Sequence, residues 1–306
     1  MKLLHVAAWL RSICLAVNVH ARSISDQGDG QTISGQPQRV VVLEYSFLDA
    51  VVLAGVSPVG IADDQRNYRI LPEIRQRLDA YQSVGLRGQP NVEMIASLRP
   101  DLIIADKYRH QAIYDELQQI APTLLLISYG AEYPQLLEDA RTIGAALGRP
   151  QRMQQALERH RRQMDRYASQ LNRQFKSTLN NKPRLLFAVT NQRTVTIHAS
   201  RAFASGVMQR LGLSTALPVN DQRAYIPVSF EQLAGMNPDW LFIGDYAARQ
   251  GGSDILKRWQ QYPLWPVLDA VKQQRVVQVD PVKWSLNRGI FGAEQIAREL
   301  TGVFSQ

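Results

Sequence analysis

Residues 89–105 of the chain, QPNVEMIASLRPDLIIA, are echoed by residues 227–243, PVSFEQLAGMNPDWLFI. Aligned without gaps, every residue lies 138 positions from its counterpart (93 to 231, for instance). Six pairs are identical or similar: Glu93 and Glu231, Ile95 and Leu233, Ala96 and Ala234, Leu98 and Met236, Pro100 and Pro238, Asp101 and Asp239. Each copy predicts a short helix, a Pro-Asp turn and a buried parallel strand. The repeat favours two related lobes; the alternative is two unrelated helix–turn–strand units that share this spacing.

Strand and helix patterns alternate around both copies. Apolar runs at 39–43, 59–62, 102–105 and 123–127 predict strands before the middle of the chain, and runs at 184–189, 241–243 and 276–279 predict strands after it. Helix patterns separate most of them, and residues 190–194 are expected to form a loop. Such alternation predicts an α/β fold with two Rossmann-like lobes, each a parallel sheet covered by helices.

A single long helix is predicted between the lobes. Gly148 stops the preceding helix pattern, Pro150 starts a new one, and apolar residues then recur at helical spacing to Phe175. Some 25 residues rising ~1.5 Å each would form a rigid rod of roughly 38 Å. The expected organisation is an N-terminal ligand-binding lobe at 37–147, a linking backbone helix at 150–177 and a C-terminal ligand-binding lobe at 182–306.

The first residues have the pattern of a signal peptide. Met1 and Lys2 precede a largely apolar stretch to Val19, and Val19-His20-Ala21 has the small-residue form of a cleavage site. An ordinary buried N-terminal helix is the alternative. The single cysteine, Cys14, lies inside residues 1–21 without the small residue expected before a lipid-modified cysteine. The sequence therefore predicts export to the periplasm, with cleavage near Ala21 and no lipid anchor.

Charge and composition narrow the class of partner. The 45% hydrophobic and 20% charged residues are typical of a globular protein. Removal of residues 1–21 deletes two of the 35 Lys and Arg residues and none of the 27 Asp and Glu residues, so the net charge falls from +8 to +6. A positive protein attracts anions. No nucleic-acid-binding motif accompanies the charge, so a small anionic ligand is favoured and nucleic acid is not.

Common enzyme signatures are absent. The chain has no G-x-S-x-G, H-E-x-x-H, G-x-x-x-x-G-K or G-x-G-x-x-G motif, and its five histidines lack metal-ligand spacing. Without Cys14 no thiolate ligand remains. We therefore expect no catalytic residues, no cofactor and no metal held directly by the protein, although a metal could arrive inside a chelator.

Two facing lobes would form a cleft beyond the carboxyl ends of their strands, where open parallel sheets bind ligands. The loops there pair Arg or Lys with Tyr or Trp. Arginine forks suit carboxylates and aromatic rings supply rigid walls. The first set of expected ligand contacts is Arg87, Tyr108, Arg109, Trp284 and Arg288. A second set is Lys107, Tyr129, Arg193 and Tyr246. For any one of these residues, solvated surface is the alternative.

Four longer stretches resemble a known family: PQRVVVLEYSFLDAVVLAGVSPVGIADD, QSVGLRGQPNVEMIASLRPDLIIAD, RHQAIYDELQQIAPTLLL and RWQQYPLWPVLDAVKQQRVVQVD. They are similar to the ferric-siderophore and cobalamin family of periplasmic substrate-binding proteins, from residue 37 to about 300. The resemblance implies two lobes joined by one rigid helix, a ligand site that includes Arg87, Tyr108, Trp284 and Arg288, and docking to a permease through Glu93 and Glu231. Without it, each glutamate would simply complement the positive end of a helix.

The resemblance also implies a role and a ligand. We expect a monomeric binding protein that holds an anionic chelate of Fe(III), ferric dicitrate in the first place, and delivers it to the inner-membrane permease and ATPase of an ABC importer. Another ferric siderophore, haem or cobalamin is the alternative within the same role. An exported two-lobed enzyme is the alternative from another class.

Overall fold

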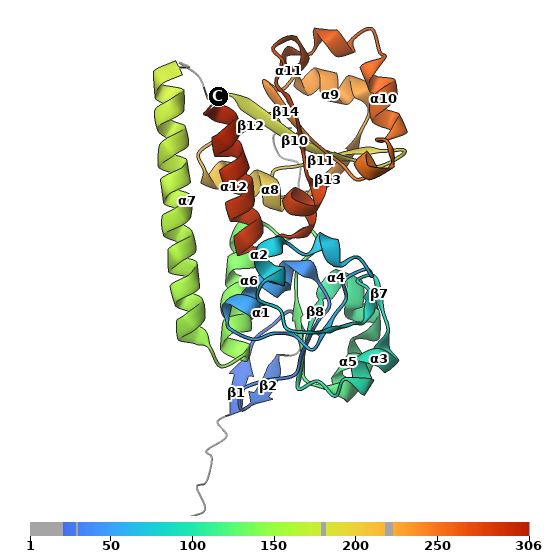
Figure 1. Ribbon diagram of the computed structural model, residues 1–306, viewed down its shortest axis with the longest axis vertical. Helices are drawn as coiled ribbons and strands as arrows, with labels where there is room; N and C mark the ends of the chain where they lie inside the picture. The colour runs from blue at the N-terminus through green and yellow to red at the C-terminus, as the bar shows by residue number, and fades with distance from the viewer. Residues whose placement is uncertain (1–20, 29, 179–181, 218–222, 306) are drawn as a thin grey trace, which may run out of the picture.

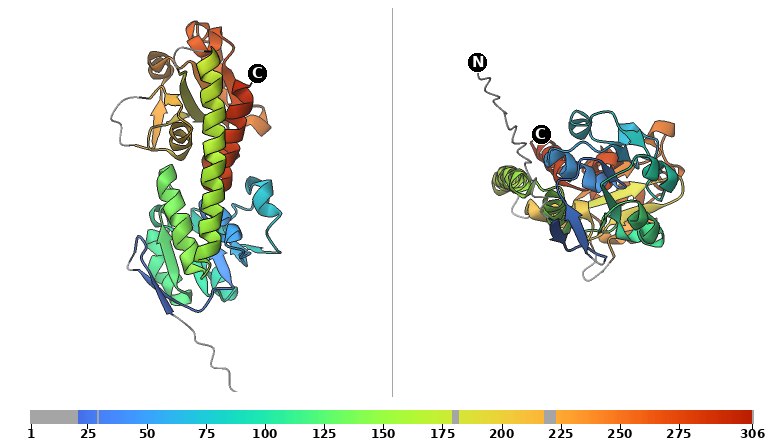
Figure 2. Two further views of the ribbon diagram at one scale, coloured as in Figure 1. Left: turned by 90° about the vertical axis from the view of Figure 1, so that its left-hand side faces the viewer. Right: turned by 90° about the horizontal axis from the view of Figure 1, so that it is seen from below.

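The structure is a computed structural model that describes residues 21–28, 30–178, 182–217 and 223–305. Two lobes lie one above the other, and the helix α7 (Pro150–Thr178) runs beside both of them along the long axis (Figures 1 and 2). The predicted architecture of two α/β lobes and one long helix is confirmed. Residues 1–20 lie outside the described part, so the signal peptide stays a prediction.

The N-terminal lobe is built on a five-stranded sheet in the order β5-β4-β3-β8-β9, with every neighbouring pair parallel. Its strands are β3 (Val40–Val42), β4 (Gly60–Ile61), β5 (Gln82–Ser83), β8 (Leu102–Asp106) and β9 (Thr123–Leu126). Two antiparallel hairpins accompany it: β1 (Ala21–Ile24) with β2 (Gln31–Ser34), and β6 (Gly85–Leu86) with β7 (Gln89–Pro90).

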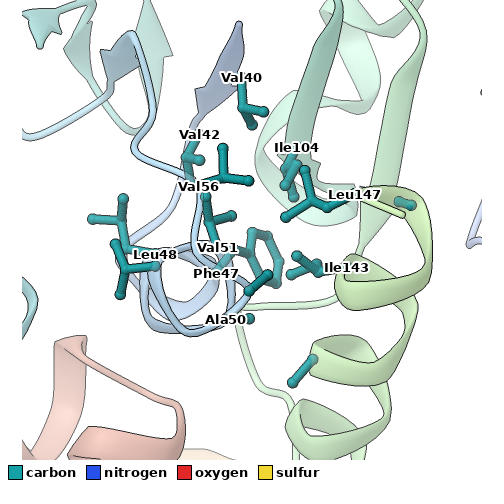
Figure 3. Packing of buried hydrophobic residues seen from close by; sticks show 14 of the residues in the cluster. Val40, Val42, Phe47, Leu48, Ala50, Val51, Val56, Ile104, Ile143 and Leu147 are labelled. Atoms are coloured by element: carbon teal, nitrogen blue, oxygen red, sulfur yellow. The ribbon is translucent and has the colours of Figure 1, made fainter. Parts of the chain in front are cut away.

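Helices cover both faces of this sheet. They are α1 (Tyr45–Leu53), α2 (Pro72–Arg75), α3 (Val92–Ser97), α4 (Lys107–His110), α5 (Tyr114–Ile120) and α6 (Tyr133–Ala146), with 3₁₀ turns η1 (Asn67–Arg69) and η2 (Gln111–Ile113). On one face Val42 and Ile104 of the strands pack against Phe47 of α1 and Ile143 of α6 (Figure 3). Each such side chain contributes about 1.5–3 kcal/mol when fully buried.

The start of the long helix α7 is set by two residues with special backbone properties, and its length follows from the helical spacing of its apolar residues. Gly148 adopts a left-handed φ of 67° after α6, a conformation that glycine takes at low cost. Pro150 then opens α7 with its φ already helical. Met153, Met164 and Leu171 are buried while the residues between them include many exposed arginines and glutamines, so one face of the rod packs on both lobes.

The C-terminal lobe differs from the prediction in one respect. Its six-stranded sheet has the order β13-β11-β10-β14-β15, with β12 also paired to β10. The strands are β10 (Arg184–Thr190), β11 (Val195–His198), β12 (Ser214–Thr215), β13 (Tyr225–Val228), β14 (Trp240–Asp245) and β15 (Val276–Val279). The pairs β10–β11 and β11–β13 are antiparallel. Asn191 accepts the backbone N–H groups of Arg193 and Thr194 in a tight turn, and such a short connection permits only antiparallel pairing.

The helices of this lobe are α8 (Phe203–Arg210), α9 (Phe230–Met236), α10 (Asp254–Gln260), α11 (Asp269–Lys272) and α12 (Ile290–Phe304), with η3 (Ala248–Gln250), η4 (Trp265–Val267) and the π-helical turn η5 (Val282–Leu286). The last helix, α12, lies beside α7 and reaches the N-terminal lobe (Figure 1). There the buried Asp49 carboxylate of α1 accepts the backbone N–H of Phe291 at 3.1 Å. A side chain at Gly289 would collide with Asp49 at 2.2 Å, so the close approach requires glycine.

The repeat in the sequence corresponds to a repeated set of contacts. In the N-terminal lobe Asp101 accepts the backbone N–H of Arg39 at 2.9 Å, and Arg39 Nη2 donates to the carbonyl oxygen of Leu98 at 2.6 Å. In the C-terminal lobe Asp239 accepts the backbone N–H of Arg184 at 2.7 Å, and Arg184 Nη2 donates to the carbonyl of Asn237 at 2.6 Å. In both lobes one Arg–Asp pair thus ties the first central strand to the turn after the repeat helix.

Within the described residues, none of the helices combines the length and the apolar character that crossing a bilayer requires.

Candidate ligand-binding cleft

A pocket of about 900 Å³ lies between the two lobes. Residues of the N-terminal lobe that follow strands β8 and β9 form one side of it, and residues just before and at the start of β13 form the other. Its lining includes three tyrosines and three arginines: Tyr108, Tyr129, Tyr225, Arg109, Arg201 and Arg223. The remaining lining is Ile127, Gly130, Ala131, Glu132, Pro134, Gln135 and Ala224. The pocket therefore combines aromatic walls with positive charge.

Beside this pocket, three arginines meet one carboxylate. Glu44 directly precedes α1 and its side chain is fully buried. Its Oε1 atom lies 2.6 Å from Nε of Arg109, and its Oε2 atom lies 3.1 Å from Nη1 of Arg87 and 3.8 Å from Nη2 of Arg288. All three arginines were predicted as ligand contacts, and the structure brings them together around Glu44.

Arg87 contacts two carboxylates and an aromatic ring. Its guanidinium pairs with Asp64 at 3.0 Å as well as with Glu44, and it lies over the ring of Tyr45 with 4.6 Å between Cζ and the ring centroid. Burial lowers the pKa of Arg87, but the charges of Glu44 and Asp64 outweigh burial and raise it. Only 8% of the residue is exposed, so Arg87 lies behind the pocket surface.

Two buried polar residues, Asp106 at the end of β8 and His110 at the end of α4, position the backbone of the arginines. Asp106 accepts the backbone N–H of Arg109 at 3.0 Å and those of Ser128 and Tyr129 at 2.6 and 3.1 Å. His110 accepts the backbone N–H of Asp106 through Nδ1, and its Nε2 lies 2.7 Å from the carbonyl oxygen of Arg87. Burial lowers the pKa of His110, which favours the neutral ring that this pair of contacts needs.

Arg288 joins the two lobes. It belongs to the turn before α12. Its Nη2 donates to the hydroxyl of Ser128 in the N-terminal lobe at 2.7 Å, and its Nε donates to the carbonyl oxygen of the same residue at 3.2 Å. The neighbouring Asn287 donates to the carbonyl oxygen of Arg69 at 2.9 Å. Arg288 is 3% exposed, so the lobes touch along the centre of the cleft.

Other pockets flank or lie apart from this centre. One of about 490 Å³ is lined by Arg66, Tyr68, Arg69, Tyr246 and Arg249 among others, and it also lies between the lobes. Arg249 stacks on Tyr68 there, 4.5 Å from the ring centroid. A pocket of about 720 Å³ lies between α6, α7 and α8 and contains none of the predicted contact residues.

The structure separates the predicted contacts into three groups. Tyr108, Arg109 and Tyr129 line the large pocket, Tyr246 lines the smaller inter-lobe pocket, and Arg87 and Arg288 lie buried between the two lobes. Trp284, Arg193 and Lys107 do not join them, for the reasons below.

Trp284 is 0% exposed and packs in the core of the C-terminal lobe, with its ring centroid 5.1 Å from Phe187 and 5.2 Å from Phe242. Its Nε1 donates to Glu299 at 2.6 Å. Arg193 lies in the β10–β11 turn beside Glu231, in a different pocket. Lys107 is half-buried and lines none of the pockets described above. None of these three residues lines either inter-lobe pocket.

The two glutamates predicted for docking occupy equivalent places. Glu93 and Glu231 are both exposed in the first turns of the repeat helices α3 and α9. Hydrogen bonds from the Glu231 backbone and from Ser229 hold the pKa of the Glu231 carboxyl below its usual value. Helix N-termini favour such charges, so their placement also has a local physical cause.

Sequence reasoning missed the partners of the arginines. Glu44, Asp64, Asp106 and His110 were not singled out, although Glu44 and Asp106 both follow predicted strands. The position of a carboxylate at the carboxyl end of a parallel strand was the available signal. Among the described residues, no group of three or more His, Cys, Asp or Glu side chains could hold a metal ion.

Comparisons with known proteins bear on the family and the fold of the chain. A family model described as "Periplasmic binding protein" matches residues 40–282. The chain is 42% identical over 285 residues to the Fe(3+) dicitrate-binding periplasmic protein FecB of Escherichia coli, covering 93% of this chain and 90% of that protein. It is 37% identical over 280 residues to the Fe(3+)-citrate-binding protein YfmC of Bacillus subtilis, covering 92% and 85%. The crystal structure of Staphylococcus aureus SirA complexed with staphyloferrin B superposes with a TM-score of 0.80 at 24% identity, covering 93% and 98%, which shows a shared fold.

Proposed function

Because the chain belongs to the periplasmic binding protein family, we propose that it binds ferric dicitrate between its lobes and delivers it to an inner-membrane ABC importer for iron uptake. It is a binding protein and not an enzyme. The iron is cargo wrapped by citrate, and the protein contacts the chelator rather than the metal. The names of FecB and YfmC, which refer to ferric citrate, support this choice of ligand.

The observation that carries the proposal is the lining of the large inter-lobe pocket. A citrate chelate presents several carboxylates and hydroxyl oxygens around its iron. Arg109, Arg201 and Arg223 place guanidinium groups at the same pocket, where Arg201 pairs with Glu132 at 2.6 Å, and Tyr108, Tyr129 and Tyr225 supply aromatic rings. The volume of about 900 Å³ suits a small organic complex. Arginine forks match carboxylates in shape and charge.

Among the predicted contacts we assign direct contact to Tyr108, Arg109 and Tyr129. Arg87 and Arg288 lie in a buried position behind the pocket, where both pair with the carboxylate of Glu44. Tyr246 borders the second inter-lobe pocket and would contact a ligand that extends into it.

We also propose the setting in which the protein works. Residues 37–147 and 182–306 form the two ligand-binding lobes and residues 150–177 the linking helix. The chain acts in the periplasm as a monomer, and its importer docks on Glu93 and Glu231. The exposure of both glutamates at equivalent places in the two lobes supports docking to a permease built with two-fold symmetry.

Calorimetric titration with ferric citrate tests the function. Calorimetry is the suitable readout because no tryptophan lies among the described residues that line the pocket. We expect saturable binding of ferric citrate and weaker binding of citrate without iron, since free citrate brings fewer carboxylates to the arginines of the pocket. A flat titration with ferric citrate at high micromolar concentration removes the proposal.

The same experiment separates the alternatives. A ferric hydroxamate, a ferric catecholate, haem and cyanocobalamin are titrated in parallel. Tighter binding of any of them than of ferric citrate would replace the ligand while keeping the transport role. A site suited to haem or a catecholate should be more apolar than one lined by three arginines.

A further inference from the structure

Glu44 connects the arginine cluster to the surface of the pocket. Of the three arginines that surround its carboxylate, only Arg109 lines the large inter-lobe pocket. The side chain of Arg109 is 29% exposed, against 9% for Arg87 and 4% for Arg288. Arg109 is therefore the member of the cluster that a ligand can reach in this structure.

Glu44 contacts one edge of the Arg109 guanidinium. Its Oε1 atom lies 2.6 Å from Nε, and no hydrogen bond is described for the two terminal nitrogen atoms. The N–H of Nε does not point directly at the oxygen, so the contact is an ion pair rather than a well-aligned hydrogen bond. The ring of Tyr129 lies 5.4 Å from the Arg109 guanidinium carbon and supports the face of the group.

Glu44 itself cannot move towards the ligand. The residue is 0% exposed, its other oxygen is engaged by Arg87 at 3.1 Å, and Arg87 is anchored in turn by Asp64. Moving this carboxylate would withdraw a shared anion from the buried guanidinium groups of Arg87 and Arg288, which is costly. A fixed anion that holds one side of a guanidinium leaves the rest of its fork available in a defined direction.

We propose that Glu44 is a positioning residue for ligand binding: it holds Arg109 by Nε so that the terminal nitrogen atoms of Arg109 grip a carboxylate of the ligand. This inference rests on the proposed function, because it assumes a carboxylate-bearing ligand in the large pocket. Glu44 acts through Arg109 and does not touch the ligand.

A double-mutant cycle tests the inference. Glu44→Gln, Arg109→Gln and the double variant are titrated with ferric citrate by calorimetry, after circular dichroism has shown that each is folded. Arg109→Gln should weaken binding about 10- to 100-fold, as expected for a hydrogen-bonded charge. Glu44→Gln should weaken binding about tenfold when Arg109 is present, and less than about twofold when position 109 is already Gln.

Asp64→Asn is the matched control. Asp64 pairs with Arg87 and Arg69 but not with Arg109, so its effect on affinity should be the same in the presence and in the absence of Arg109. If Glu44→Gln does not fold, Glu44→Asp replaces it in the cycle, since it keeps the charge and withdraws the carboxylate from Nε. The expected coupling is the same.

Each outcome decides a separate question. If Glu44→Gln lowers the affinity for ferric citrate equally with Arg109 and with Gln at position 109, its role is merely structural and the inference is overturned. Unchanged affinity of Glu44→Gln with Arg109 in place would overturn it as well. Both results leave the proposed function standing. Failure of the unmodified protein to bind ferric citrate overturns the proposed function, and the inference with it.

Discussion

The ring centroid of Tyr129 lies 5.2 Å from that of Tyr225, although Tyr129 belongs to the N-terminal lobe and Tyr225 to the C-terminal lobe. Both tyrosines line the large inter-lobe pocket. The two rings thus meet across the lobes, and the guanidinium carbon of Arg109 lies 5.4 Å from the ring centroid of Tyr129. An aromatic pair of this kind contributes about 0.5–1.5 kcal/mol beyond its buried area.

The hydroxyl of Tyr225 leads to a first prediction. The oxygen is buried and has no hydrogen-bond partner among the described residues. Tyr225→Phe should therefore keep or slightly raise the melting temperature, because it removes an unsatisfied polar group. If the ligand supplies the missing partner, the same change should weaken ferric citrate binding by roughly 3- to 10-fold. Calorimetry and thermal unfolding of one preparation measure both; unchanged affinity would show that the ligand does not reach this hydroxyl.

A second prediction compares two arginines that the sequence placed in the same cleft. Arg109 lines the large pocket, whereas Arg193 lies in the β10–β11 turn beside Glu231. Arg109→Ala should weaken ferric citrate binding about 10- to 100-fold, because a charged hydrogen-bond donor is lost. Arg193→Ala carries the same change of charge and should leave the affinity within about twofold. Equal losses would point to net charge rather than contact as the basis of binding.

A third prediction concerns Asp139 in α6. Burial raises the pKa of its carboxyl from 3.8 to about 7, and its Oδ2 atom has no hydrogen-bond partner. A group whose pKa is higher in the folded state stabilises the fold fully below about pH 4, and this contribution is lost as the pH rises towards 7. Asp139→Asn should therefore raise the free energy of unfolding at about pH 8 by roughly 1–3 kcal/mol and change it little at about pH 4.

Urea denaturation of wild type and variant at several pH values checks this. The difference between the two curves isolates Asp139 from other titrating groups, including the buried Asp49, whose pKa burial also raises to about 7. A difference that stays constant from acid to alkaline pH would contradict the prediction.

A fourth prediction separates docking from ligand binding. Glu93→Arg combined with Glu231→Arg should lower iron uptake in cells by about tenfold or more, because a permease surface that pairs with two carboxylates would meet positive charges instead. The affinity for ferric citrate should not change, since neither glutamate lines the large inter-lobe pocket. Glu116→Arg with Glu158→Arg makes the same change of net charge at other exposed positions and should leave uptake intact. Normal uptake by the first pair would refute docking through these glutamates.

Several features of the fold could be predicted because local and long-range signals agree. The Gly148 and Pro150 pair marks the boundary between α6 and α7, since both residues act through their own backbone. The repeat around Pro100 and Pro238 predicted strands β8 and β14 because an apolar run after a turn has few other stable outcomes. These signals lie within a few residues of the structure that they specify.

Other features depend on contacts that sequence spacing does not encode. Trp284 follows a strand, where ligand-binding aromatic residues are often found. Its ring nevertheless packs on Phe187 and Phe242 in the core, and the spacing of the sequence does not reveal this contact. Glu44 precedes a helix, where a carboxylate is common for local reasons, and its three arginines come from residues 43, 65 and 244 positions away. Strand β11 was not predicted, because the polar residues of the short turn at Asn191 have the pattern of a longer loop.

The bond between Asp49 and the start of α12 has a consequence for the mechanics of the molecule. The final helix α12 packs beside α7 and its first turn contacts α1, so the two lobes are joined by α7, by α12 and by the hydrogen bonds of Arg288 and Asn287. Several connections in parallel resist twisting of the lobes as well as their separation. A single nick in α7 should accordingly leave the two lobes associated.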